Sequence, residues 1–166
     1  MSEKALAGAI RVAPVRKHVR VSVNVDRAFE AFCLNFDRWW PRDKHIGKSA
    51  IKRAILEPFA GGRWYEVGDD GSQCEWGSVL VWEPPKRLVL AWQIAADFTY
   101  DAKLKTTVEV RFTPEGAGTL GELEHRDLEM MGVNAAHVRG VFDSTKGWGA
   151  VLGLYAKFVE EPSYGR

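Results

Sequence analysis

The stretch WGSVLVWEPPKRLVLAW, residues 76–92, places three tryptophans in two short apolar segments separated by Pro84-Pro85. Aromatic and β-branched residues dominate both segments, which favours β-strands. The two prolines cannot donate backbone hydrogen bonds to a neighbouring strand, so they favour a turn between the segments. The stretch therefore predicts two paired strands and a tight connection.

Both faces of the first of these strands are apolar. By simple alternation, Trp76, Leu80 and Trp82 share one face, whereas Val79 and Val81 take the other. Strands that are apolar on both faces are typical of the middle of a layer, where more than one surface is covered. We therefore expect this hairpin to lie centrally in its sheet.

Strand signals continue on both sides of the hairpin. Several segments alternate apolar and polar residues, and Asp70-Gly71 is a typical signal for a tight hairpin turn. The predicted strands are VRKHVRVSV (15–23), IKRAILEPF (51–59), GGRWYEV (61–67), QCEWGSVLVW (73–82), RLVLAWQI (87–94), KTTVEVRF (105–112) and TLGELEHRDL (119–128). About seven strands with hairpin-length connections indicate an antiparallel sheet.

Two regions have helical rather than strand character. After the first strand, Asp26 is a candidate N-cap for a small helix, and Pro41 ends the helical region that follows. In the last third of the chain the apolar spacing changes to three and four residues, which predicts a short helix over 134–142 and a longer one over 145–160. The residues of this stripe are Val138, Val141, Thr145, Trp148, Leu152, Tyr155 and Val159.

These elements predict an α+β fold: a curved antiparallel sheet of about seven strands around a long C-terminal helix, with two small helices after the first strand. A sheet that curls round one helix buries the apolar stripe and leaves a wedge between the two, which is a natural place for a small molecule. We expect one domain over residues 14–162 and a flexible tail over residues 1–13.

Composition excludes several classes of partner. The chain has 166 residues, with 23 Lys and Arg against 22 Asp and Glu, and a formal net charge of +1. This balance gives no general attraction to nucleic acid or to an anionic membrane. The start of the chain lacks a long apolar run, which predicts a cytoplasmic protein without a membrane anchor. Cys33 and Cys74 lack a paired motif and are expected to be small buried apolar groups rather than a disulfide framework.

A family resemblance is carried by several segments together, in order and spacing, over residues 15–160. These segments are EAFCLNFDRWWP (30–41), KHIG (44–47), EPFAGGRWYEVGDDG (57–71), WGSVLVWEPPKRLVLAW (76–92), LEHRDLEMMG (123–132) and GWGAVLGLYAKFVE (147–160). They resemble the bacterial family related to the C-terminal domain of the activator of heat-shock protein 90 ATPase. That family lies in the START-like (SRPBCC, helix-grip) superfamily, which also contains polyketide cyclases and lipid-transfer domains.

The resemblance implies the helix-grip fold but leaves function open, because this scaffold hosts binding, transfer and catalysis. The co-chaperones for which the family is named carry a further N-terminal domain. The short segment before residue 15 cannot replace that domain, so the resemblance does not imply activation of a chaperone.

The aromatic content points to a cavity. Seven Trp, eight Phe and four Tyr are more than a small core ordinarily needs, although each tryptophan taken singly is more typical of packing. We expect two or three tryptophans to border a hollow. The candidate ligand-binding residues are Trp39, Trp40, Trp64, Glu66, Trp76, Trp92, His125, Trp148 and Tyr155.

Among these candidates, His125 and Glu66 are ionisable. His125 shares a strand face with Leu123, so its imidazole could orient a ligand or transfer a proton; the alternative is a core histidine held by a backbone carbonyl. Glu66 shares a face with Trp64, and the alternative is that it faces solvent. His45 is expected at the mouth of the hollow. No metal motif or nucleotide motif is present, so no metal and no cofactor are expected.

Three functions remain open from the sequence. We expect binding of a small hydrophobic or aromatic ligand between the sheet and the C-terminal helix, without catalytic residues. One alternative is a cyclase- or hydrolase-like enzyme in which His125 or Glu66 moves a proton on a substrate held by tryptophans. The other is a protein-interaction module, acting as a homodimer through the aromatic strands or through contact with a chaperone.

Overall fold

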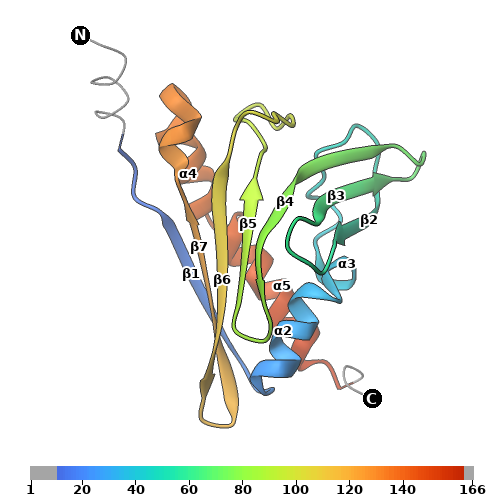
Figure 1. Cartoon of the computed structure of the whole chain (residues 1–166), viewed down its shortest axis with the longest axis vertical. Helices are drawn as coiled ribbons and strands as arrows, with labels where there is room; N and C mark the ends of the chain where they lie inside the picture. The colour runs from blue at the N-terminus through green and yellow to red at the C-terminus, as the bar shows by residue number, and fades with distance from the viewer. Residues whose placement is uncertain (1–10, 163–166) are drawn as a thin grey trace.

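The computed structural model describes residues 11–162 and contains a single seven-stranded antiparallel sheet (Figure 1). The strands are β1 (Val15–Val21), β2 (Ile51–Leu56), β3 (Arg63–Gly68), β4 (Gln73–Glu83), β5 (Arg87–Trp92), β6 (Thr106–Glu115) and β7 (Gly118–Arg126). Their order in the sheet is β1-β7-β6-β5-β4-β3-β2, so β2 to β7 form successive hairpins and β1 pairs with β7. The predicted strand number and the central position of the β4–β5 hairpin are confirmed.

The helices follow the predicted arrangement. They are α2 (Val25–Cys33), α3 (Phe36–Trp39), the 3₁₀ segment η1 (Leu128–Asn134), α4 (Ala135–Asp143) and α5 (Trp148–Glu160). In Figure 1, α5 runs along one face of the sheet, with α2 and α3 beside it. This is the α+β helix-grip fold expected from the sequence. The N-cap of α2 was predicted wrongly: Asn24, not Asp26, accepts a hydrogen bond from the Arg27 amide at 2.9 Å.

The central strand β4 departs from simple alternation. Its pairing with β3 skips Trp76, because Trp64 pairs with Gly77 and Tyr65 with Glu75, which marks a bulge. Its pairing with β5 shifts register again between Val79 and Val81. Trp76 and Val79 are consequently both buried, whereas Leu80 is exposed. The predicted grouping of Leu80 with Trp76 on one face is therefore wrong, because the extra residue in a bulge reverses the facing of the residues beyond it.

The turns match the sequence signals. Gly71 has φ +83°, the left-handed conformation that the Asp70-Gly71 hairpin turn requires. Pro84-Pro85 lies in the turn between β4 and β5. Where β4 pairs with β5, Gly77 has no room for a side chain, since a Cβ atom there would lie 1.7 Å from the Ala91 carbonyl oxygen.

Aromatic side chains fill most of the space between the sheet and α5. Tyr155 is buried on α5 and donates a hydrogen bond from its hydroxyl to the Ala28 carbonyl at 2.6 Å. Its ring contacts Phe32 and Trp39, with centroids 5.2 and 5.4 Å away. The wedge predicted along the helix is thus packed at Tyr155 by the rings of Phe32 and Trp39.

The described chain begins at residue 11 and ends at residue 162. Most of the predicted tail, residues 1–10, lies outside the described residues. Its last part is held against α4, because Arg139 donates hydrogen bonds to the carbonyls of Ala13 and Pro14. Cys33 and Cys74 are free thiols; Cys33 is buried as expected, whereas Cys74 is only partly buried. Within residues 11–162, every helix is too short or too polar to cross a membrane.

Candidate ligand-binding site

A pocket of about 370 Å³ opens at the N-terminal end of α5. Its walls come from β4 and β5, from the loop after α3, from the loop after β5 and from the α4–α5 junction. We call it the aromatic pocket. It is lined by Trp40, Asp43, Lys44, His45, Ile46, Trp76, Trp92, Phe98, Val141, Phe142, Ser144, Lys146, Gly147, Trp148 and Val151. Its volume lies in the range of about 300–1,000 Å³ that is usual for small-molecule sites.

Four tryptophans form the apolar part of the pocket wall. The ring centroids of Trp40 and Trp76 lie 5.1 Å apart, those of Trp92 and Trp148 lie 5.8 Å apart, and those of Trp40 and Trp148 lie 6.3 Å apart. Contacts at these spacings between tilted and edge-on rings are favourable, so the rings support one another. They come from the loop after α3, two strands and α5, which brings residues distant in sequence to one wall.

A buried carboxylate fixes the loop that forms another wall. Glu66 on β3 is 1% exposed, and its Oε1 accepts hydrogen bonds from the Ile46 amide at 2.5 Å, the Gly47 amide at 3.1 Å and the Trp76 indole at 2.8 Å. The Trp40 indole donates to the Lys44 carbonyl at 3.0 Å. Glu66 itself does not line the pocket. It holds the loop and one tryptophan in place from behind.

The same loop presents His45 to the pocket. Its Nδ1 lies 2.7 Å from the Gly47 carbonyl oxygen, and since a carbonyl can only accept, Nδ1 must carry the proton. In the neutral ring, Nε2 is then the basic nitrogen. Lys44 Nζ donates to the Lys146 carbonyl at 2.6 Å, which joins this loop to the α4–α5 junction across the pocket. Lys44 and His45 thus place polar groups at the mouth of the pocket.

His125 lies behind the wall rather than in it. It is 0% exposed and its Nδ1 accepts a hydrogen bond from the Trp148 indole at 3.0 Å. Nε2 therefore carries the proton and donates to Thr106 Oγ1 at 2.7 Å, and the Thr106 hydroxyl donates to the Trp92 carbonyl at 3.0 Å. Burial lowers the pKa of His125 from 6.5 to about 3. A neutral imidazole with both nitrogens occupied has no free group for proton transfer.

The structure divides the nine predicted site residues into two sets. Trp40, Trp76, Trp92 and Trp148 line the aromatic pocket. The others lie outside its lining. Trp39 donates from its indole to the carbonyls of Ala31 and Phe32, and Trp64 is fully buried among other indoles. The remaining members of this second set are Glu66, His125 and Tyr155.

Two aromatic lining residues were not named from the sequence. Phe142 ends the predicted short helix, and its ring stacks on His125 with centroids 4.8 Å apart. Phe98 lies in the loop after β5, which carries no periodic signal. Helical spacing could have indicated Phe142, because Val138 and Phe142 lie four residues apart on one face. The position of Phe98 depends on how the loop folds back.

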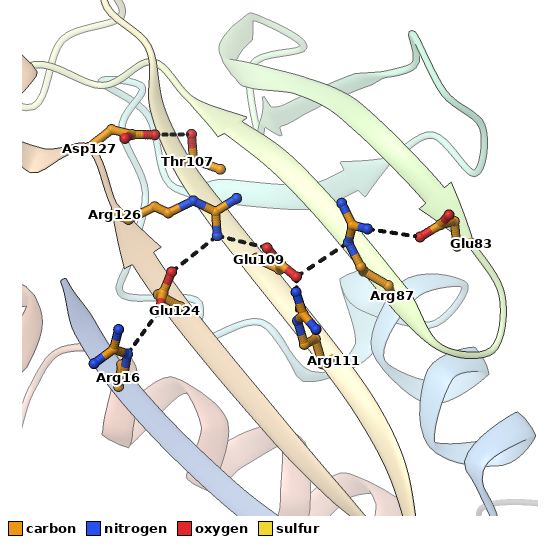
Figure 2. Close-up of polar contacts among 9 residues, drawn as sticks. All are labelled: Arg16, Glu83, Arg87, Thr107, Glu109, Arg111, Glu124, Arg126 and Asp127. Carbon is orange, nitrogen blue, oxygen red and sulfur yellow. Dashed lines mark hydrogen bonds and ion pairs between the residues drawn. The ribbon is translucent and has the colours of Figure 1, made fainter.

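A larger hollow, about 790 Å³, lies on the face of the sheet away from α5 and is lined by charged side chains. At its centre, Glu109 Oε1 lies 2.7 Å from Arg126, while Oε2 lies 2.5 Å from Arg111 and 3.3 Å from Arg87 (Figure 2). Burial alone would raise the pKa of Glu109, but hydrogen bonds from Arg126 and Arg111 lower it. The charges satisfy one another, so we regard the aromatic pocket as the better candidate site.

The described residues contain no group of three side chains suited to hold a metal ion. A family model, Activator of Hsp90 ATPase homolog 1-like protein, matches residues 22–160. The chain belongs to this family. Its fold is that of the START-like superfamily, as the resemblance implied.

Solved structures of other proteins extend the comparison of this family member. It is 34% identical to an anthrahydroquino-gamma-pyrone synthase, Txn09, with a TM-score of 0.61, covering 88% of this chain and 96% of that chain. It is 25% identical to CalC from Micromonospora echinospora, a self-sacrificing resistance protein, with a TM-score of 0.66, covering 92% and 97% of the two chains. MLL2253 from Mesorhizobium loti, at 18% identity and a TM-score of 0.64 over 89% and 96% of the two chains, shows the shared fold. None of the curated proteins compared with the chain matches it.

Proposed function

We propose that this protein binds a small, flat, ring-containing molecule in the aromatic pocket. The observation that carries the proposal is an opening of about 370 Å³ with four indoles in its walls, beside a well-packed apolar core. The four indoles are themselves only 1–6% exposed. A planar apolar ligand would add contacts to the part of their ring surface that borders the pocket.

The hydrogen bonds of the indoles support an apolar ring system as the ligand class. The N–H groups of Trp40, Trp76 and Trp148 donate to the Lys44 carbonyl, to Glu66 and to His125. These three residues therefore offer ring surface rather than hydrogen-bond donors to a ligand. Specific polar contacts would come from the mouth, where Lys44 and His45 lie.

Similarity to Txn09 supports an apolar ring system as the ligand class. That protein is named as an anthrahydroquino-gamma-pyrone synthase, and it is 34% identical to this chain, with 88% of this chain covered. The shared sequence and fold make a polycyclic aromatic molecule the first ligand to test.

The test uses 1,8-dihydroxyanthraquinone and isothermal titration calorimetry. Val141 lines the pocket and is 38% exposed, so Val141→Trp would narrow the opening while leaving the core intact. Val133 is 93% exposed and lies outside the pocket lining, which makes Val133→Trp a matched control. We expect wild-type protein and the Val133 variant to bind alike, and the Val141 variant to bind at least about tenfold more weakly, or about 1.4 kcal/mol. Equal binding by all three proteins would reject this pocket.

Catalysis in the same pocket is a second candidate, favoured by the synthase relative and by His45. Because Nδ1 of His45 is directed to the Gly47 carbonyl, Nε2 is the free base that could remove a proton from a bound substrate. His45 would thus take the role that the sequence analysis assigned to His125 or Glu66. Hydrogen–deuterium exchange at the acidic C–H of benzoylacetone, followed by NMR, would test it: exchange should be accelerated by the wild type and not by His45→Gln. Equal rates would reject a catalytic His45.

A further inference from the structure

Phe98 has a backbone conformation that is unusual for its side chain. Its φ is +62°, and among the residues that the structure describes only Asp127 shares a positive φ without being glycine. Aspartate tolerates the left-handed region because its short side chain can hydrogen-bond locally, whereas a phenylalanine has no such compensation. A glycine or asparagine would be the ordinary residue at this position.

The loop does not need the Phe98 side chain for its own structure. The Phe98 amide donates to the Ala95 carbonyl at 2.8 Å, and the Ala95 amide donates to the Thr99 carbonyl at 2.8 Å. Asp97 Oδ1 accepts from the Thr99 amide at 3.2 Å and from its hydroxyl at 2.6 Å. Backbone groups, Asp97 and Thr99 make all of these bonds, and a glycine at position 98 would preserve them.

Burial does not compensate for the strained backbone either. The Phe98 side chain is 51% exposed, yet it lines the aromatic pocket and a small adjoining depression beside Val138 and Val141. Strained backbone conformations cluster at binding sites and active sites. Phe98 combines such strain with a half-exposed aromatic ring at the edge of a pocket.

We infer that Phe98 is a ligand-contacting residue that covers one ring of the bound molecule at the mouth of the aromatic pocket. The inference rests on the proposed function and adds to it that the ligand extends as far as the mouth, with an apolar ring there. On binding, the exposed surface of Phe98 becomes buried against that ring, and the strain of the loop is retained in both states.

The experiment separates binding from stability. Phe98→Gly removes the ring and relieves the strain, and Phe98→Leu keeps an apolar side chain without the aromatic ring. Phe59 is also about half-exposed and lies outside the lining of the aromatic pocket, so Phe59→Ala is the matched control. Each protein is titrated with 1,8-dihydroxyanthraquinone by calorimetry and unfolded thermally without ligand.

We expect Phe98→Gly to melt at the same temperature as the wild type or higher, and to bind at least about tenfold more weakly. Phe98→Leu should bind with intermediate affinity, and Phe59→Ala should bind as the wild type does. Unchanged affinity of Phe98→Gly would overturn the inference and leave the proposed function standing. A lower melting temperature of Phe98→Gly would also overturn it, because the ring would then support the fold. Failure of the wild type to bind would instead overturn the proposed function, and the inference with it.

Discussion

His125 makes the stability of the fold depend on pH in a defined window. In the folded protein its imidazole is neutral, buried and hydrogen-bonded through both nitrogens, and its pKa is lowered from 6.5 to about 3 by burial. In the unfolded chain the same group regains the pKa of an ordinary histidine, about 6.5. Above that pH the group is neutral in both states and has no effect on the free energy of unfolding.

Below pH 6.5 the unfolded chain takes up a proton that the folded protein cannot, so stability falls as the pH falls. The loss approaches about 1.4 kcal/mol per pH unit. It amounts to about 2 kcal/mol between pH 7 and pH 5, and would reach about 5 kcal/mol below the folded pKa. The change between pH 7 and pH 5 alone is a large fraction of the roughly 5–15 kcal/mol that stabilises a typical domain.

Urea unfolding of wild-type protein and His125→Gln at pH 7 and pH 5 measures this difference. A glutamine can accept from the Trp148 indole and donate to Thr106, but it does not titrate. The variant should therefore lose about 2 kcal/mol less stability than the wild type over this interval. The exposed histidines are common to both proteins, so their contributions cancel. Equal losses in the two proteins, or an NMR titration in which His125 gains a proton near pH 6, would refute the reasoning.

Further predictions test the buried carboxylates and the close approach of two strands. Glu66→Leu leaves three donors unpaired and should destabilise by about 3 kcal/mol or more, whereas Glu66→Gln retains an acceptor oxygen and should cost about 1 kcal/mol. Equal losses of the two variants in urea unfolding would argue against a role of Glu66 in holding the loop and Trp76 by hydrogen bonds. Gly77→Ala should prevent stable folding, because its Cβ would meet the Ala91 carbonyl. Gly153→Ala, which has open space around it on α5, should stabilise the protein by about 0.5–1 kcal/mol. Thermal melts followed by circular dichroism that rank the two variants in the reverse order would contradict both predictions. Glu109→Gln should cost about 1–3 kcal/mol at pH 7, because it weakens the ion pairs with the surrounding arginines, and unchanged stability by calorimetry would show that these pairs contribute nothing.

The fold was predictable because its signals are local. Alternation over residues 105–112 and 119–128 identifies strands, and Asp70-Gly71 identifies a turn without knowledge of any distant contact. The facing of Leu80 was not predictable, since the bulges in β4 arise from its pairing with β3 and with β5. A residue's side of the sheet depends on the partner strand wherever regular pairing breaks down.

The site was only partly predictable for a related reason. The sequence indicates that tryptophans are inward-facing, but burial is common to the core and to a pocket wall. Trp64 and Trp76 both face inward, and only Trp76 lines the pocket. Which indole borders open space depends on where the loop after α3 and the α4–α5 junction come to lie, and the contact between Lys44 and Lys146 that joins them spans about a hundred residues of sequence.

The two ionisable residues singled out from the sequence act on the pocket from behind its walls. Glu66 accepts a hydrogen bond from the Trp76 indole, and His125 accepts one from the Trp148 indole. Neither Glu66 nor His125 lines the pocket. A hydrogen bond from an indole N–H to a buried polar group holds the ring in one orientation. Apolar packing alone fixes the orientation of a ring less specifically. A wall built in this way keeps its shape before a ligand arrives, so less ordering is required on binding. The strand faces that Glu66 shares with Trp64 and His125 with Leu123 are inward in the structure. A polar residue on such a face is therefore a signal of how the aromatic pocket is kept in shape.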